Sequence, residues 1–138
     1  KLYSDYEQLV GGVETLFGAG GAELEEYAAS VGKTVSDAEA EYNALIAAQD
    51  AVMANARDAW KNAGMSANEY MDTVTSFSAA LIQGLGGDTQ AAAKVADIAI
   101  TDMADNANKM GTDLASIQYA YQGFAKDNYT INNLMSAA

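Results

Sequence analysis

No proline occurs among the 138 residues of this chain, so no helix is forced to break where a backbone N–H is missing. About seven prolines would be expected at average usage in a chain of this length. The commonest residue is alanine, which is the strongest helix former. Half of the residues are hydrophobic, so the chain should bury a core. These features predict an all-α fold without a sheet, in which residues 1–138 form one compact helical domain.

Serine and glutamate three residues apart mark three places where a helix can begin. In such a capping box the serine hydroxyl accepts a hydrogen bond from the N–H three residues on, and the glutamate accepts one from the serine N–H. The three boxes are residues 4–7, 36–39 and 66–69. Asp88 and Thr112 follow glycine-containing breaks and are expected to cap two further helices.

Glycine is expected to end these helices, because it tolerates the left-handed conformation found just after a helix C-terminus. The expected stops are Gly18, Gly20, Gly21, Gly32, Gly64, Gly86, Gly87 and Gly111. One pair, Gly11 and Gly12, lies inside an apolar helical stripe instead. There it lowers helix stability and suits either a close helix crossing or a kink.

Apolar residues at helical spacing fill each interval between these starts and stops, which predicts about six helices in a compact array. The third helix is expected from Ser36 to Asn62, with Trp60 on its apolar face, and the fifth from Asp88 to Met110. The sixth begins at Thr112, and residues 128–138 are expected to be irregular or frayed. The six apolar stripes contain Leu9, Val10, Val13, Leu16 and Phe17; Leu24, Tyr27, Ala28 and Val31; Tyr42, Leu45, Ile46, Val52, Met53, Ala56 and Trp60; Tyr70, Val74, Phe77, Leu81 and Leu85; Val95, Ile98, Ala99, Met103, Ala107 and Met110; and Leu114, Ile117, Tyr121 and Phe124.

The chain lacks the side chains on which most enzymes depend. It contains no histidine and no cysteine, which excludes the serine–histidine–aspartate triad, thiolate nucleophiles, the usual zinc sites and disulfides. Its net charge of −12 leaves too few cations to neutralise several phosphates, so direct nucleic-acid binding is not expected. We therefore expect no catalytic residues, no metal and no cofactor.

Three clusters of carboxylates or glycines could in principle form a functional site, but each also has a structural explanation that we favour. Asp97, Asp102 and Asp105 form a polar cluster in which Asp102 and Asp105, one helical turn apart, could share a cation, but a solvated helix face with terminal capping is the favoured interpretation. Glu23 and Glu26 could act as acid and base on a glycan, but they lie in a charged surface turn. The run at residues 84–88 resembles a phosphate loop only superficially, because it lacks the lysine and places an aspartate at the helix start.

Aromatic side chains on more than one face of the last expected helix are the best candidates for a protein-contact surface. A single helix can bury only one face against its own core, so some of these side chains must be exposed or must pack against something else. The candidate contact residues are Tyr119, Tyr121, Gln122, Phe124 and Tyr129.

Four strings in the second half of the chain, and one near its start, resemble a known family. They are YMDTVTSFSA at residues 70–79, ITDMADNANKMGT at 100–112, YQGFAK at 121–126, NYT at 128–130 and LVGGVETLF at 9–17. These strings resemble tape measure proteins, the tail-length rulers of long-tailed phages and prophages of Gram-positive bacteria. The resemblance is strongest over residues 66–130.

The resemblance implies a structural, non-enzymatic function. A tape measure protein occupies the tail lumen of the virion after assembly in the host cytoplasm, and it leaves ahead of the genome. The implied partners are tail tube subunits, tail assembly chaperones and neighbouring segments of the same long chain, and self-association is open. Family members are far longer, and they continue past the NYT string into a Leu-Lys-Leu-Gly-Tyr-Gly-Gly-type segment that is not found here. The chain is therefore expected to be one domain of a longer protein.

Frequent caps and glycine stops favour a folded domain over a straight spacer. A continuous ruler helix would have few glycines and would rise about 1.5 Å per residue. The alternative hypothesis is a helical binding module of a secreted or cell-associated bacterial protein that recognises its partner through Tyr119 to Tyr129. A glycan-cleaving enzyme that uses carboxylates ranks third.

Overall fold

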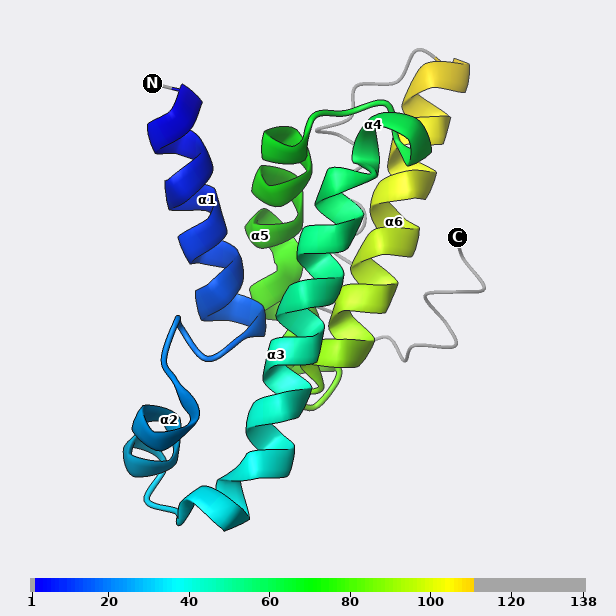
Figure 1. Cartoon of the computed structure of the whole chain (residues 1–138). Helices are drawn as coiled ribbons and strands as arrows, with labels where there is room; N and C mark the ends of the chain where they lie inside the picture. Colours follow the sequence, from blue (N-terminus) through cyan, green and yellow to red (C-terminus); the bar gives the residue numbers. More distant parts are fainter. Residues whose placement is uncertain (1, 111–138) are drawn as a thin grey trace.

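The computed structural model describes residues 2–110, and it describes side chains for residues 5–105. Within that part of the chain there are six α-helices and no strand, which confirms the all-α fold (Figure 1). The expected sixth helix, from Thr112, lies outside the described residues. The six helices are α1 (Leu2–Phe17), α2 (Leu24–Ser30), α3 (Val35–Arg57), α4 (Ala59–Asn62), α5 (Ala67–Gly84) and α6 (Thr89–Met110).

Two of the predicted helix starts are confirmed by their hydrogen bonds. At α5 the N–H of Glu69 donates to Ser66 Oγ at 3.1 Å, and the N–H of Ser66 donates to Glu69 Oε1 at 3.0 Å. At α6 the N–H of Ala91 donates to Asp88 Oδ1 at 3.0 Å. Both caps satisfy backbone donors that have no partner within the helix.

The other two predicted capping boxes are wrong. The first helix already begins at Leu2, so Ser4 lies inside it. The third helix is capped by Thr34, whose hydroxyl accepts from the N–H of Asp37 at 3.1 Å, so Ser36 is a helical residue. Two overlapping cap sequences compete here, and the helix begins at the earlier one because that start adds further hydrogen-bonded residues.

The long third helix expected from Ser36 to Asn62 is divided in two. Asp58, at φ −93° and ψ 0°, ends α3 and precedes the short helix α4. The break rotates the following residues, so Ala59 and Ala63 are buried and Trp60 is 71% exposed. The expectation that Trp60 continues the apolar face of Val52 and Ala56 is therefore wrong, because that face requires unbroken four-residue spacing.

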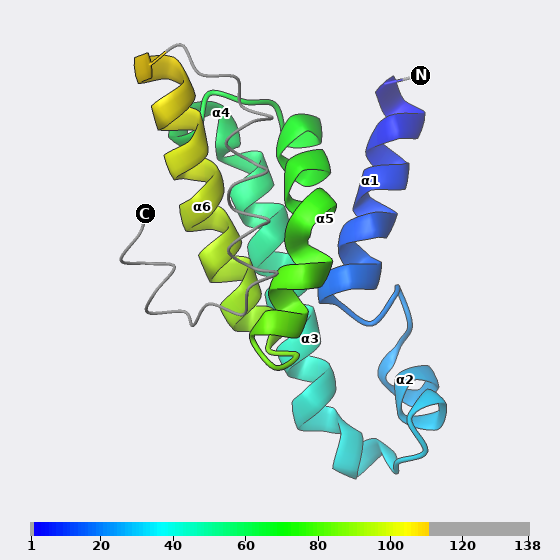
Figure 2. The same cartoon turned by 180° about the vertical axis from the view of Figure 1, so that it is seen from behind.

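Four helices enclose the core. Helices α1, α5 and α6 pack on one another, and α3 packs against all three (Figures 1 and 2). The core includes the large side chains of Phe17, Tyr70, Met71, Ile100 and Met103. Where α3 meets α6 the buried residues are mostly alanines, which let two helix axes approach closely. These buried alanines are Ala48, Ala56, Ala92, Ala93, Ala96 and Ala99.

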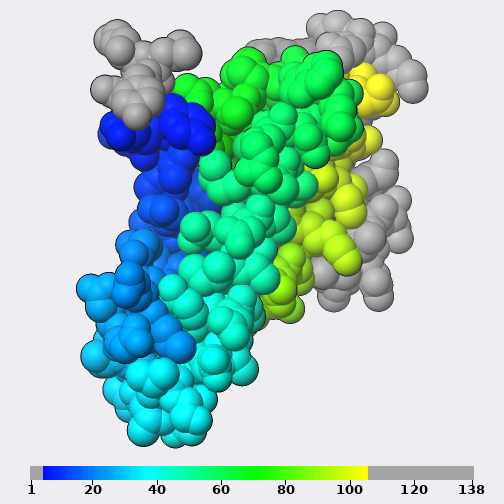
Figure 3. Space-filling view, in the orientation of Figure 1, coloured from blue at the N-terminus to red at the C-terminus, as the bar shows by residue number. Residues whose placement is uncertain are grey.

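Helix α2 and the first turns of α3 project beyond the four-helix core as an arm, defined here as residues 22–42 (Figures 1 and 3). Helix α2 packs on α3. The arm has its own buried residues, Ala28 and Ala38, which do not belong to the main core cluster. The arm is thus a small helical hairpin held by its own contacts.

Six of the eight expected glycine stops are confirmed, and a seventh, Gly111, lies outside the described residues. Six glycines have positive φ at helix ends or in the turns between helices, which is the conformation expected of them. They are Gly20, Gly21, Gly32, Gly64, Gly86 and Gly87. Helix α1 ends at Phe17, directly before Gly18, but Gly18 is not among the residues with positive φ. The pair Gly11 and Gly12 lies inside the continuous helix α1, and a Cβ at Gly12 would only touch Thr75 of α5 at an ordinary 3.7 Å.

Replacing Gly11 with alanine is expected to stabilise the protein by about 0.5–1 kcal/mol, because Gly11 is helical and a Cβ there meets nothing within 4 Å. The matched control is Gly86→Ala, at φ 71°, which should instead destabilise the protein because alanine is strained in that conformation. Urea unfolding followed by circular dichroism measures both changes. Equal signs for the two variants would contradict this interpretation.

Candidate functional site

The predicted contact residues Tyr119, Tyr121, Gln122, Phe124 and Tyr129 lie outside the described residues. Within the described part of the chain there are three candidate interaction sites. They are a groove between α3 and α6, the projecting arm, and the exposed side chain of Trp60 on α4.

The groove between α3 and α6 has a volume of about 660 Å³ and is open along one side. Both helices lie side by side in Figures 1 and 3. Small side chains make up much of its lining, so the groove is wide without being deeply enclosed. The lining residues are Ala47, Ala48, Ala51 and Asn55 from α3, and Asp88, Gln90, Ala91, Ala93, Lys94, Asp97 and Ile98 from α6 and its cap.

A partly buried hydrogen bond reaches the groove from α5. The hydroxyl of Tyr70, a residue that is 1% exposed, donates to Asp97 Oδ1 at 2.6 Å. Burial, followed by the hydrogen bond to Asp97, raises the pKa of Tyr70 far above its ordinary value. Tyr70 is therefore a neutral hydrogen-bond donor at any physiological pH, and it orients the carboxylate rather than exchanging protons with it.

The groove is better suited to another protein segment than to a small molecule. Small-molecule pockets are usually enclosed and lined by large apolar and aromatic side chains. Among the described residues no aromatic side chain lines this groove, and one of its carboxylates, that of Asp97, already accepts from Tyr70. A helix, by contrast, can approach closely over alanines on two parallel neighbours.

Sequence reasoning did not find this groove. It assigned Tyr70 to the core and Asp97 to a polar helix face. The structure buries Tyr70 and places Asp97 at the open groove, but the sequence did not link the two. A buried tyrosine nearly always needs a partner for its hydroxyl, and that requirement was the available signal for a link between the two. Which carboxylate supplies the partner depends on how α5 and α6 pack.

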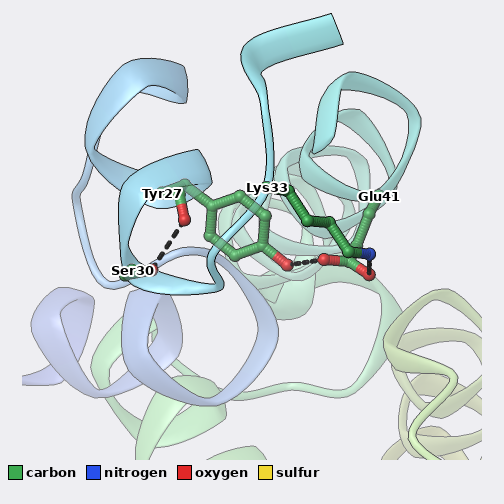
Figure 4. Close-up of polar contacts among 4 residues, drawn as sticks. All are labelled: Tyr27, Ser30, Lys33 and Glu41. Atoms are coloured by element: carbon green, nitrogen blue, oxygen red, sulfur yellow. Dashed lines mark hydrogen bonds and ion pairs between the residues drawn. The ribbon is translucent and has the colours of Figure 1, made fainter. Parts of the chain in front are cut away.

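Polar contacts hold the arm together (Figure 4). The hydroxyl of Tyr27 in α2 donates to one carboxylate oxygen of Glu41 in α3, and Lys33 Nζ lies 3.2 Å from the other. Ser30 Oγ donates to the carbonyl of Tyr27 at 2.7 Å. The ring of Tyr42 lies 5.6 Å from that of Tyr27, centroid to centroid, and its hydroxyl donates to the carbonyl of Ala22 at 2.9 Å.

The arm should weaken in acid. The Tyr27 hydrogen bond, followed by that of Lys33, lowers the pKa of Glu41, so its contribution is present above the unfolded-state pKa and is lost as the pH falls through the folded-state pKa. Carboxyl titration by NMR should find Glu41 below its usual range, and Tyr27→Phe should return it most of the way. Ser30→Ala is the control that leaves the carboxylate contacts intact. An unchanged Glu41 pKa in Tyr27→Phe would contradict the assignment.

The same hydrogen bond raises the pKa of the Tyr27 hydroxyl, whereas it lowers the pKa of Glu41. The contact with Glu41 raises the pKa of Tyr27 to about 12. The stabilising contribution of Tyr27 is therefore complete below its ordinary pKa and is lost only as the pH rises toward 12. The arm is consequently held by this pair throughout the neutral range.

For the carboxylates that the sequence made candidates for catalysis or cation binding, the structure shows no such site among the described residues. Glu26 Oε1 accepts from the N–H of Glu23 at 3.1 Å, so this pair caps α2. Both Asp102 and Asp105 lie on α6. Among the residues that the structure describes, no group of three or more carboxylate, histidine or cysteine side chains could hold a metal ion.

Four large hydrophobic side chains are exposed on the described surface. Trp60 is the most exposed of them, at 71%, and it lies on α4 at the opposite end of α3 from the arm. Val31 and Val35 lie at the turn between α2 and α3, and Tyr6 lies on α1. None of the described helices is long and apolar enough to cross a membrane.

Comparison of the chain with protein-family models, with curated proteins and with solved structures finds no match.

Proposed function

We propose that this chain is a folded structural segment of a phage tape measure protein, acting in tail assembly and tail-length determination. The support is the resemblance of its strings to that family and the positions of those strings in the fold. Residues 9–17 lie in α1, residues 70–79 in α5, and residues 100–110 end α6. These three helices pack against one another, so the strings contribute to one core.

The observation that carries the proposal beyond a simple ruler is that the helices fold back on one another. A straight helix of this length would extend about 200 Å at 1.5 Å per residue. The longest helix among the described residues, α3, has 23 residues and so spans only about 35 Å. A segment packed in this way adds little length, which favours a docking or assembly element within the longer ruler.

The proposed setting follows from the same resemblance. The segment would lie in the tail lumen of the virion, after assembly in the bacterial cytoplasm. Its partners would be tail tube subunits, tail assembly chaperones and neighbouring segments of the same chain. A net charge of −12 suits a channel that later conducts DNA, because an acidic protein does not retain phosphates. It is thus compatible with a function in genome passage.

Tail length measured by electron microscopy tests this function. In the phage gene that encodes the segment, residues 1–138 are deleted in frame. We expect abolished tails, or tails shortened by much less than the roughly 20 nm that a straight helix would contribute. The matched control deletes 138 residues of continuous predicted helix elsewhere in the same gene, which should shorten tails by about 20 nm. Equal shortening by both deletions would show that the segment counts as ordinary ruler.

We propose no enzymatic activity for the chain. It has neither histidine nor cysteine, and the suspected carboxylate pair caps a helix. Incubation of the purified protein with bacterial cell wall should release no soluble glycan or peptide fragments. Release of such fragments would support the glycan-cleaving alternative.

The second candidate function is a helical protein-binding module of a secreted or cell-associated bacterial protein. The exposure of Trp60 favours it, because tryptophan is enriched at the energetic centres of protein interfaces. The sequence around the segment distinguishes the two functions. Hundreds of flanking helical residues would support the tape measure protein, whereas secretion or anchoring signals beside the segment would support the binding module.

A further inference from the structure

We propose that residues 22–33, with α2 at their centre, form a latch that undocks from α3 and unfolds while the four-helix core stays folded. The proposal rests on how α2 is packed, on the glycines that flank it and on the contacts that hold it (Figures 1 and 4). It is independent of the proposed function, because it concerns only how the described helices separate from one another.

Helix α2 is attached to the molecule through α3. Among the described helices, α3 is the one on which α2 packs substantially. The main core cluster of the described residues contains no side chain from the arm. Undocking of α2 therefore leaves the packing of that cluster unchanged.

Helix α2 is too short to persist once it is undocked. It has seven residues, whereas isolated helices shorter than about 12–15 residues are marginal in water. One of its side chains, that of Ala28, is buried, so the loss of apolar burial opposes the opening only weakly. Undocking and unfolding of this segment are therefore coupled.

Glycines on both sides of α2 let the backbone change direction at the two ends of the latch. Gly21 has a φ of 83° and Gly32 a φ of 69°, a conformation that glycine adopts at little cost. A Cβ at Gly32 would meet nothing within 4 Å, so no described residue crowds this turn. Before the latch, Gln49 of α3 fills the space that a side chain at Gly18 would need. The chain is thus held against α3 at Gly18, and the motion begins after that residue.

Contacts near the surface hold the latch closed. The hydroxyl of Tyr27 donates to Glu41, and Lys33 pairs with the other oxygen of that carboxylate. The Lys33 and Glu41 side chains are 43% and 45% exposed, and such exposed ion pairs contribute little to stability. The hydroxyl of Tyr42 donates to the carbonyl of Ala22. Water can replace each of these partners, so opening the latch requires much less free energy than unfolding the core.

Opening uncovers an apolar stripe on the first turns of α3. Val35, Ala38 and Tyr42 follow at spacings of three and four residues, so they share one face of the helix. In the closed state Ala38 is buried, and the ring of Tyr42 lies against that of Tyr27. The start of α3 does not depend on α2, because Thr34 caps it with a local hydrogen bond. The open state therefore presents a preformed helix face that the closed state covers.

Hydrogen exchange, measured by NMR at pH 6, tests the latch. Its reporters are the N–H groups of Tyr27, Val31 and Lys33, which donate to backbone carbonyls within the segment. We expect them to be protected at least about a hundredfold less than the N–H groups of Val74 and Phe77 in the core helix α5. Their exchange rates should also be nearly independent of low urea concentrations, because a local opening exposes little surface.

Two variants separate local opening from global unfolding. Val74→Ala leaves a cavity in the core, so it should speed exchange at Phe77 at least about tenfold and leave the latch unchanged. Tyr27→Phe removes the hydroxyl that donates to Glu41, so it should speed exchange in the latch about twofold to tenfold. Tyr6→Phe, the same change at an exposed site on α1, is the matched control and should leave the latch unchanged.

The variants give outcomes that decide the proposal. Equal protection of the latch and the core, or faster exchange of the latch in Val74→Ala, would show that α2 opens only with the whole bundle and would overturn the proposal. Unchanged exchange of the latch in Tyr27→Phe would show that the contact with Glu41 does not hold it closed, which contradicts the proposal as well. Neither result bears on tail length, so the proposed function is tested separately.

Discussion

Replacing Phe17 with alanine should lower the free energy of unfolding by about 3–5 kcal/mol, the usual cost of removing a buried phenylalanine side chain. Phe17 ends α1 and is 0% exposed within the main core cluster. It is one of the large side chains through which α1 joins the bundle, so its removal leaves a cavity that the neighbouring helices can fill only partly. Since domains of this size are stable by only about 5–15 kcal/mol, much of the stability would be lost.

Chemical unfolding in urea, followed by circular dichroism, measures this loss. The matched control is Tyr6→Ala, which removes an aromatic ring from the same helix at a site that is 42% exposed. That variant should change stability by less than about 1 kcal/mol. Similar losses for the two variants would show that α1 does not depend on Phe17 for its attachment.

The second large effect is expected at the partly buried hydrogen bond between Tyr70 and Asp97, a lining residue of the groove. Tyr70→Phe keeps the ring and removes the hydroxyl that donates to Asp97 at 2.6 Å. Hydrogen bonds to charged groups contribute about 1.5–3 kcal/mol, and an unpaired buried acceptor adds a further penalty. Because Asp97 also lines an open groove, water can replace the lost donor, which favours the lower half of that range.

A double-mutant cycle isolates this interaction. Tyr70→Phe, Asp97→Asn and the double variant are compared by urea unfolding, and the coupling energy should be about 1 kcal/mol or more. Tyr27→Phe is the comparison on the arm, where the partner Glu41 is exposed and a smaller effect is expected. A coupling energy near zero for Tyr70 and Asp97 would indicate that the two side chains contribute independently.

Helix caps and glycine turns were predicted correctly where the residue forms its hydrogen bonds, or adopts its special backbone conformation, within a few residues of itself. The box at Ser66 and the cap at Asp88 form the predicted hydrogen bonds, and Gly86 adopts positive φ as expected. At Thr34 and Ser36 two such signals overlapped, and propensity alone did not rank them. The helix begins at Thr34 because the earlier start adds further hydrogen-bonded residues.

Trp60 shows the limit of periodicity. Its spacing from Val52 and Ala56 predicted a core position, but the break at Asp58 turned Trp60 toward solvent and buried Ala59 in its place. Asp58 is flanked by good helix formers, so nothing local required a break there. The packing of α4 against α3 and α5 selects it.

For the candidate site, too, sequence reasoning found one feature and missed another. Sequence reasoning placed the contact surface at Tyr119 to Tyr129, because aromatic residues there fall on more than one face of the expected helix and so depart from the one-sided apolar pattern. It overlooked the groove, since alanine on α3 and α6 reads only as a strong helix former. A groove exists only where two such helices lie side by side, and their pairing involves residues more than thirty positions apart.

The amino-acid pattern was sufficient for the all-α class, for the starts of α5 and α6, for most glycine turns and for most of the buried faces, because caps, glycine turns and amphipathic stripes act over three or four residues. Only the tertiary structure decided the division of α3 from α4, the projection of the arm, the pairing of Tyr70 with Asp97 and the groove between α3 and α6. Each of these depends on contacts between helices distant in the chain. Their free energies exceed the small differences in local propensity that the sequence expresses.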